Sequence, residues 1–238
     1  PRRRGTRPVV LLIPGMLNTA AIWDRVAPLL QDAAELRIAD VLTQSSIAEM
    51  TRDAWALLAD VPPTTPVLIC GFSMGGYVAI DMVARPPRSI AGLVLLDTSP
   101  RPEPPDGEIV RAKTITAFER NFAKVVENML AFTTHPDHHQ DTALFDTLRA
   151  IMLPVGAQAA VRQTRAVAAR ADHRAQLAAL AIPTRVLCGR EDKVTPPELS
   201  QELADLIPGA QLEWLAQSGH MAPVEQPREV ANAIRKFL

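Results

Sequence analysis

Short apolar runs alternate with longer stretches of mixed polar and apolar residues along most of the chain. Most of these runs are continuous rather than alternating, which is typical of strands covered on both faces in a parallel sheet. The stretches between them have helical spacing and short connections. The pattern therefore predicts an α/β fold with a mostly parallel, doubly wound sheet. The expected strands are residues 9–13, 36–42, 67–70, 90–96, 184–188 and 211–215.

Helix starts are marked by serine, threonine and proline. Ser46-Ile-Ala-Glu49 has the pattern of a capping box and predicts a helix that runs towards residue 61. Thr195-Pro-Pro-Glu198 has the same pattern, with Pro196 in the first helical turn, where a missing N–H costs nothing. Pro227 is expected to begin the last helix.

The strand rhythm is interrupted once, between residues 101 and 181. Apolar residues in this segment recur at helical spacing, and it holds four of the six phenylalanines of the chain. We predict an α/β core in residues 1–100 and 182–238, with a helical cap inserted at 101–181. Some of the cap side chains are expected to fill its own small core and others to line an apolar pocket. The candidate substrate-binding residues in the cap are Phe118, Phe122 and Met129.

A nucleophile motif follows the third apolar run. Gly71-Phe-Ser73-Met-Gly75 matches the G-x-S-x-G elbow, in which a tight turn between a strand and a helix lifts the serine above the sheet edge. Small residues are needed there because neighbouring side chains would collide. Ser73 is therefore the candidate nucleophile.

A serine hydroxyl needs a base, and the base needs an acid that orients it. His220, in a loop just past the last strand, is the candidate base. Asp192, which follows the penultimate strand and precedes His220 with room for one helix and one strand, is the candidate acid. Glu191 and the strand-end residue Asp97 remain alternatives. The other histidines are expected in a polar loop (His135, His138, His139) and in a solvated helical stretch (His173).

These motifs resemble the α/β-hydrolase superfamily, in its branch of small esterases that carry a cap. The likeness covers residues 9–98 and 184–238. It implies that the residue after the glycine in Pro14-Gly15-Met16 donates a backbone N–H to an oxyanion hole, together with the N–H of Met74. Relatives commonly have histidine at the position of Pro14, and this chain lacks it. Met221, which adjoins the proposed base, is a further candidate for contact with substrate, although core packing explains it equally well.

Composition and charge limit the kinds of partner that we expect the protein to bind. Apolar residues make up 47% of the chain and the formal net charge is −1, so no overall field attracts the protein to nucleic acid or to an anionic membrane. No apolar run reaches the roughly 18 residues of a membrane span, and no secretory signal is evident, so we expect a cytoplasmic protein. Cys70 and Cys188 end apolar runs and are expected to be buried thiols. The oligomeric state is not predicted.

The sequence therefore predicts a serine hydrolase that cleaves small to medium apolar carboxylic esters without a metal or organic cofactor. Lactonase, thioesterase, carbon–carbon bond hydrolase and perhydrolase activities use the same three side chains and stay open. A ligand receptor that has lost turnover is the alternative from another class. Serine at the elbow disfavours dehalogenase and epoxide hydrolase chemistry, for which the resemblance implies aspartate.

Overall fold

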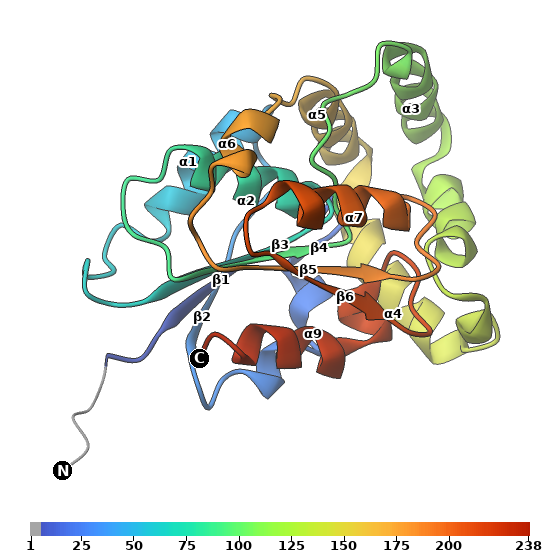
Figure 1. The fold of residues 1–238 in the computed structure, drawn as a ribbon. Helices are drawn as coiled ribbons and strands as arrows, with labels where there is room; N and C mark the ends of the chain where they lie inside the picture. Colours follow the sequence, from blue (N-terminus) through green and yellow to red (C-terminus); the bar gives the residue numbers. More distant parts are fainter. Residues whose placement is uncertain (1–5) are drawn as a thin grey trace.

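The sheet is the centre of the molecule. The computed structural model describes residues 6–238; residues 1–5, part of the segment searched for a secretory signal, lie outside the described residues. Six parallel strands pair in the order β2-β1-β3-β4-β5-β6 (Figure 1). The predicted parallel α/β architecture is thereby confirmed. The strands are β1 (Val9–Ile13), β2 (Glu35–Ile38), β3 (Val67–Phe72), β4 (Gly92–Leu96), β5 (Thr184–Gly189) and β6 (Gln211–Leu215).

Helices cover both faces of this sheet. One face packs against α1, α2, α6 and α7, and the opposite face against α9 and two 3₁₀ helices near the N-terminus (Figure 1). The 3₁₀ helices are Ala20–Trp23, Ala27–Leu29, Pro136–His138 and Leu153–Val155. The α-helices are α1 (Ile47–Ala56), α2 (Met74–Ala84), α3 (Gly107–Phe132), α4 (Thr142–Met152), α5 (Gly156–Ala168), α6 (Arg174–Ala178), α7 (Pro197–Leu206), α8 (Ala222–Glu225) and α9 (Pro227–Arg235).

Two hydrophobic clusters, one on each face, account for the continuous apolar strands. Val10 and Leu12 of β1 point into one cluster, and Val9 and Leu11 into the other. Successive strand residues alternate between faces, so a strand covered on both faces must be apolar at every position. The thiols of Cys70 and Cys188 are buried and free, as the sequence predicted.

The expected strand at 36–42 is shorter than predicted. It ends at Ile38, and the following Asp40 side chain accepts hydrogen bonds from the Leu42 N–H (3.1 Å) and the Thr43 hydroxyl (3.1 Å). An aspartate that bonds to nearby backbone in this way favours a turn over a continued strand.

Between β4 and β5 the described chain forms helices α3 to α6 and no strand. We call residues 107–168, which hold α3 to α5, the helical insertion. Helices α3 and α4 lie beyond the carboxyl ends of the strands (Figure 1), whereas α6 packs against α2 and α7. The proposed division at residues 101 and 181 into core and cap stays a prediction.

One helical stretch, Thr142–Ala168, is long and apolar enough to cross a membrane by length and composition alone. Our expectation concerned continuous apolar runs, and this stretch is interrupted by charged residues, among them Asp146 and Arg149. The stretch consists of α4, a 3₁₀ turn and α5, and the backbone leaves helical geometry at Gly156 (φ 77°). A core helix of a soluble protein passes the same test.

The register of the parallel strands gathers their carboxyl ends at one edge of the sheet. Leu96 at the end of β4 pairs with Leu187 of β5, and Gly189 at the end of β5 pairs with Leu215 at the end of β6. Side chains that follow β3, β4, β5 and β6 therefore meet at this edge, where ligands of open α/β sheets bind.

Candidate active site

Ser73 occupies the turn between β3 and α2. Its backbone has φ 54° and ψ −118°, a conformation that costs a non-glycine residue on the order of 1–3 kcal/mol. The turn is so tight that a Cβ at Gly71 would lie 2.3 Å from the carbonyl oxygen of Gly75. The Thr98 hydroxyl donates to the Ser73 carbonyl at 2.8 Å and holds the strained turn from the neighbouring strand end. The sequence motif is thus explained by its backbone.

The imidazole of His220 lies directly over this serine. Its Nε2 is 2.9 Å from Ser73 Oγ, within hydrogen-bond distance. The His220 backbone N–H donates to the carbonyl oxygen of Thr133 at 2.8 Å, so the helical insertion fixes the loop that carries the ring. The ring is 6% exposed and packs against Phe72, with ring centroids 5.3 Å apart. His220 is therefore well placed to take a proton from Ser73.

The Asp192 carboxylate supports the other side of the ring. Its Oδ2 lies 2.9 Å from His220 Nδ1, and its Oδ1 accepts the N–H groups of Val194 (2.9 Å) and Thr195 (3.0 Å). Burial opposes ionisation, but the charge and hydrogen bond of His220 and the remaining donors outweigh it and lower the pKa of Asp192 to about 2. The competing Glu191 side chain is exposed. The geometry brings Ser73, His220 and Asp192 together.

Thr195 has a different role from the one its sequence pattern predicted. Helix α7 begins at Pro197 with Pro196 as its cap, and no side chain caps it. The Thr195 hydroxyl instead donates to Asp192 Oδ2 at 2.8 Å and lies 3.3 Å from His220 Nδ1. The predicted capping box at this helix is therefore wrong, because the helix begins two residues after Thr195 and the threonine hydroxyl is turned towards the Asp192 carboxylate.

The capping box predicted at Ser46 is formed in part. The Ser46 hydroxyl accepts the Glu49 N–H at 3.1 Å at the start of α1. The Glu49 carboxylate reaches back to the N–H of Ser45 at 2.7 Å, one residue earlier than a capping box requires.

Asp97, the alternative acid, is a second buried carboxyl at this edge. One atom each of Asp97, Asp192 and His220 lie within 4.8 Å of one another. Burial, followed by the charge of Asp192, raises the pKa of the Asp97 carboxyl well above its usual range. Such a cluster could hold a metal ion by proximity, but Asp192 Oδ2 and His220 Nδ1 are already bonded to each other. We therefore assign the cluster to hydrogen bonding.

The loop after β1 packs against the nucleophile. A Cβ at Gly15 would lie 3.0 Å from the Ser73 Cβ, so glycine is what allows this close approach. The N–H groups on either side of Met16 are occupied: Gly15 donates to Asn18 Oδ1 at 3.0 Å, and Leu17 donates to Gln163 Oε1 at 3.1 Å. Within residues 6–238 no protein atom accepts the Met16 N–H.

Glu225 is a residue of the site that sequence analysis missed. Its buried carboxylate accepts the N–H groups of Gly219 (2.9 Å) and Met221 (3.2 Å), the two neighbours of His220. It also accepts the His135 N–H at 2.6 Å and lies 2.9 Å from His138 Nδ1. The only feature of the sequence that could have pointed to Glu225 is its position five residues after His220.

Three of the other histidines are less exposed than the sequence predicted. His138 is half-buried through its bond to Glu225, and His139 is half-buried with Nε2 2.9 Å from the Ala131 carbonyl oxygen. His173, expected to be solvated, is half-buried with Nε2 2.6 Å from Asp81 Oδ1. Their rings form hydrogen bonds with groups elsewhere in the fold, which a single sequence cannot reveal.

The candidate substrate-binding residues all belong to one hydrophobic cluster at the carboxyl edge. Phe118 and Met221 are each 2% exposed, whereas Phe122 and Met129 are half-buried. The rings of Phe118 and Phe122 lie 5.8 Å apart, and the cluster also contains Phe72, next to the nucleophile. Contact of these four side chains with substrate stays a prediction.

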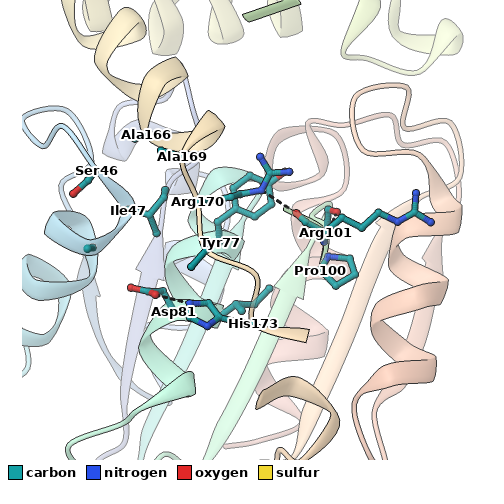
Figure 2. A pocket seen from close by; sticks show the side chains of 14 residues that line it. Ser46, Ile47, Tyr77, Asp81, Pro100, Arg101, Ala166, Ala169, Arg170 and His173 are labelled. Atoms are coloured by element: carbon teal, nitrogen blue, oxygen red, sulfur yellow. Dashed lines mark hydrogen bonds and ion pairs between the residues drawn. The ribbon is translucent and has the colours of Figure 1, made fainter. Parts of the chain in front are cut away.

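A separate cavity lies between α1, α2 and the segments by which the chain enters and leaves the helical insertion (Figure 2). Four of its polar side chains interact in two pairs: Asp81 binds His173, and the Arg170 guanidinium lies 4.4 Å from the Tyr77 ring centre. Arg170 Nε also donates to the Arg101 carbonyl at 3.0 Å. Ser73, His220 and Asp192 do not line this cavity, so we assign it no part in catalysis.

Comparison with known proteins finds esterases and another hydrolase among the similar proteins. A pimeloyl-[acyl-carrier protein] methyl ester esterase of Aromatoleum aromaticum is 28% identical to the chain, over 96% of the chain and 97% of that protein. A 2-hydroxymuconate semialdehyde hydrolase of Pseudomonas sp. strain CF600 is also 28% identical, over 92% of the chain and 81% of that protein. The solved structure of a thermophilic esterase from Thermogutta terrifontis superimposes with a TM-score of 0.86 at 27% identity, covering 98% of the chain and 90% of the esterase.

The family model of alpha/beta hydrolases matches residues 10–233, which is nearly the whole described chain. The match covers the elbow, the helical insertion and the loops that carry Asp192 and His220. The chain therefore belongs to the alpha/beta hydrolase family and is a hydrolase.

Proposed function

We propose that the protein is a serine hydrolase that cleaves carboxylic esters of small to medium size. The observation that carries the proposal is the continuous contact from Ser73 Oγ to His220 Nε2 and from His220 Nδ1 to Asp192, each at 2.9 Å. The same constellation serves acyl transfer on several unrelated folds, so it is recognised by its geometry.

In this mechanism His220 takes the Ser73 proton as the hydroxyl oxygen attacks the ester carbonyl carbon. Asp192 stabilises the imidazolium that forms and holds the tautomer with hydrogen on Nδ1. The protonated Nε2 then gives its hydrogen to the leaving alcohol. Water, deprotonated by the same nitrogen, attacks the acyl-serine and releases the acid, which restores Ser73.

The oxyanion of the tetrahedral intermediate is proposed to accept the N–H groups of Met16 and Met74. Two facts support this assignment. The Met16 N–H lacks an acceptor within the described chain although both neighbouring N–H groups have one. Met74 is the first residue of α2, and first-turn N–H groups have no partner inside their own helix. Loss of one such donor typically costs about a hundredfold or more in rate.

Ester cleavage is favoured over the alternatives by the names of the relatives, one of which acts on a methyl ester and two of which are called esterases. Carbon–carbon bond hydrolysis is the second candidate, because the 2-hydroxymuconate semialdehyde hydrolase is equally similar in sequence. Both reactions need the same three side chains. The apolar cluster around Phe118 and Phe122 supports an apolar acyl or alcohol group in either case.

A direct test compares the wild type, Ser73→Ala and the matched control Ser45→Ala on a series of p-nitrophenyl acyl esters. Ser45 is exposed near the start of α1, so its removal should leave turnover unchanged. We expect turnover and fluorophosphonate labelling in the wild type and in Ser45→Ala, and neither in Ser73→Ala. A non-catalytic receptor would release no more nitrophenol than Ser73→Ala does. Faster turnover of lactones, thioesters or vinylogous diketones than of every ester would instead indicate a lactonase, a thioesterase or a carbon–carbon bond hydrolase, respectively.

A further inference from the structure

Asp97 lies at the end of β4, beside the strand that leads to Asp192. Its backbone N–H donates to the Leu187 carbonyl at 2.9 Å, and its Oδ1 accepts the Gly189 N–H at 2.9 Å. The backbone of Asp97 has φ 47°, which a non-glycine residue rarely adopts. This strained conformation directs the carboxyl across to β5, at the carboxyl edge of the sheet.

The second oxygen of Asp97 has no visible partner. Oδ2 is fully buried, and no hydrogen-bond donor of the described chain reaches it. No arginine or lysine of residues 6–238 forms an ion pair with this carboxyl. A buried carboxylate oxygen without a donor is costly, which indicates that the group is not a carboxylate.

The carboxylate of the neighbouring Asp192, in contrast, is surrounded by hydrogen-bond donors. His220 Nδ1, the Thr195 hydroxyl and two backbone N–H groups all meet its oxygens. Two carboxyls enclosed within 4.8 Å cannot both carry charge at low cost, so the charge resides on the one with donors. The other carboxyl keeps its proton, and that proton needs an acceptor.

We propose that Asp97 is a positioning residue whose protonated Oδ2 donates a hydrogen bond to the Asp192 carboxylate and keeps that carboxylate aligned with His220. The proposal rests on the proposed function of Ser73, His220 and Asp192. It adds a consequence: when Asp192 is neutral, Asp97 ionises and becomes the acid that supports the imidazolium. The site thus holds two carboxyls that share one proton.

The electrostatics of the surrounding elements agree with this arrangement. The titratable groups around Asp97 are Asp192 on the loop after β5, Cys188 within β5 and His220 on the loop after β6. Burial and the Asp192 charge raise the pKa of Asp97, and burial raises the pKa of the Cys188 thiol, which is therefore neutral. A hydrogen bond from Asp97 is among the influences that lower the pKa of Asp192.

A double-mutant cycle on ester turnover tests the coupling. Asp97→Asn keeps shape, neutrality and a donor, so we expect kcat/KM within about threefold of wild type and an unmoved acid limb of the pH profile. Removing the acid of such a triad outright costs about ten-thousandfold. We expect Asp192→Asn to lose only about a hundredfold, because Asp97 takes over, and the double variant to lose the full ten-thousandfold.

Two outcomes of the cycle would overturn the proposal. If Asp97 is ionised in the wild type, Asp97→Asn shifts the acid limb to lower pH, because a charge that stabilises the imidazolium is lost. If Asp97 merely links β4 to β5, Asp97→Asn has the same effect in the Asp192→Asn background as in the wild type.

A second measurement does not depend on turnover. Infrared spectra of the wild type with isotope-labelled aspartate carboxyls should show a protonated carboxylic acid at neutral pH, and Asp97→Asn identifies the band by its disappearance. Absence of the band in the wild type contradicts the proposal even if a variant fails to fold. If the wild type shows no turnover that depends on Ser73, the proposed function fails, while this spectrum still decides where the proton lies.

Discussion

Replacement of Glu225 by glutamine should disturb the loop of His220 more than any substitution of a residue that the mechanism does not use. The two carboxylate oxygens of Glu225 accept three backbone N–H groups and lie 2.9 Å from His138 Nδ1, with two contacts on each oxygen at 2.6–3.2 Å. Glutamine keeps one of these oxygens and places an NH₂ group where the other was. The least costly orientation puts the NH₂ group beside His138, whose other tautomer can accept a hydrogen bond from it, and leaves the His135 N–H facing a donor.

The cost can be worked from these contacts. A buried donor left without an acceptor costs about 1–3 kcal/mol of the 5–15 kcal/mol that typically separates folded from unfolded protein. At a urea m-value of about 3 kcal/mol/M the unfolding midpoint should fall by about 0.3–1 M. Since Gly219 and Met221 flank the ring, a displacement of about 1 Å would lower kcat/KM by about a hundredfold.

The assay is urea unfolding followed by intrinsic fluorescence, together with p-nitrophenyl ester turnover on the same preparations. Glu229→Gln is the matched control, because Glu229 is exposed on α9 and should change stability by less than about 0.5 kcal/mol. A Glu225→Gln variant with the midpoint and turnover of the control would show that this carboxylate does not hold the His220 loop.

Three further changes test other parts of the site. Relative to wild type, the free energy of unfolding of Asp97→Asn should rise by about 1.4 kcal/mol per pH unit from about pH 4 up to the raised pKa of native Asp97, because native Asp97 keeps a proton that the unfolded carboxyl loses. Urea midpoints from about pH 5 upwards measure this rise, and a constant difference contradicts it. Thr195→Val removes the hydroxyl 2.8 Å from Asp192 and should lower kcat/KM by about tenfold, whereas Thr195→Ser should retain activity. Gly15→Ala places a methyl group 3.0 Å from the Ser73 Cβ and should slow both ester turnover and fluorophosphonate labelling by about tenfold or more, with unfolding midpoints showing whether the fold is kept.

The fold and the central contacts were predictable because their signals are local. Most strands are continuous apolar runs, and Ser73, Asp192 and His220 follow the ends of β3, β5 and β6 within five residues. Parallel strands carry such residues to one edge whatever the details of packing. The G-x-S-x-G motif adds the backbone constraint that the observed φ of Ser73 explains.

The remainder of the site depends on contacts between distant segments. Thr195 has the sequence pattern of a helix cap, and only its distance of 2.8 Å to Asp192 reveals a different partner. Glu225 serves backbone groups up to 90 residues away, and backbone donors leave no trace in the identity of their residues. The sequence identifies Asp97 as an alternative acid, but it cannot show that Oδ2 of this residue lacks a hydrogen-bond partner.

The bond from the His220 N–H to the Thr133 carbonyl has a consequence for engineering and for divergence within the family. The helical insertion, in which we expect contacts with substrate, also anchors the main chain of the proposed base. A graft that replaces α3 together with its C-terminal turn would therefore change reactivity as well as selectivity. Chimeras that retain residues 133–138 from this chain should keep the two properties separable.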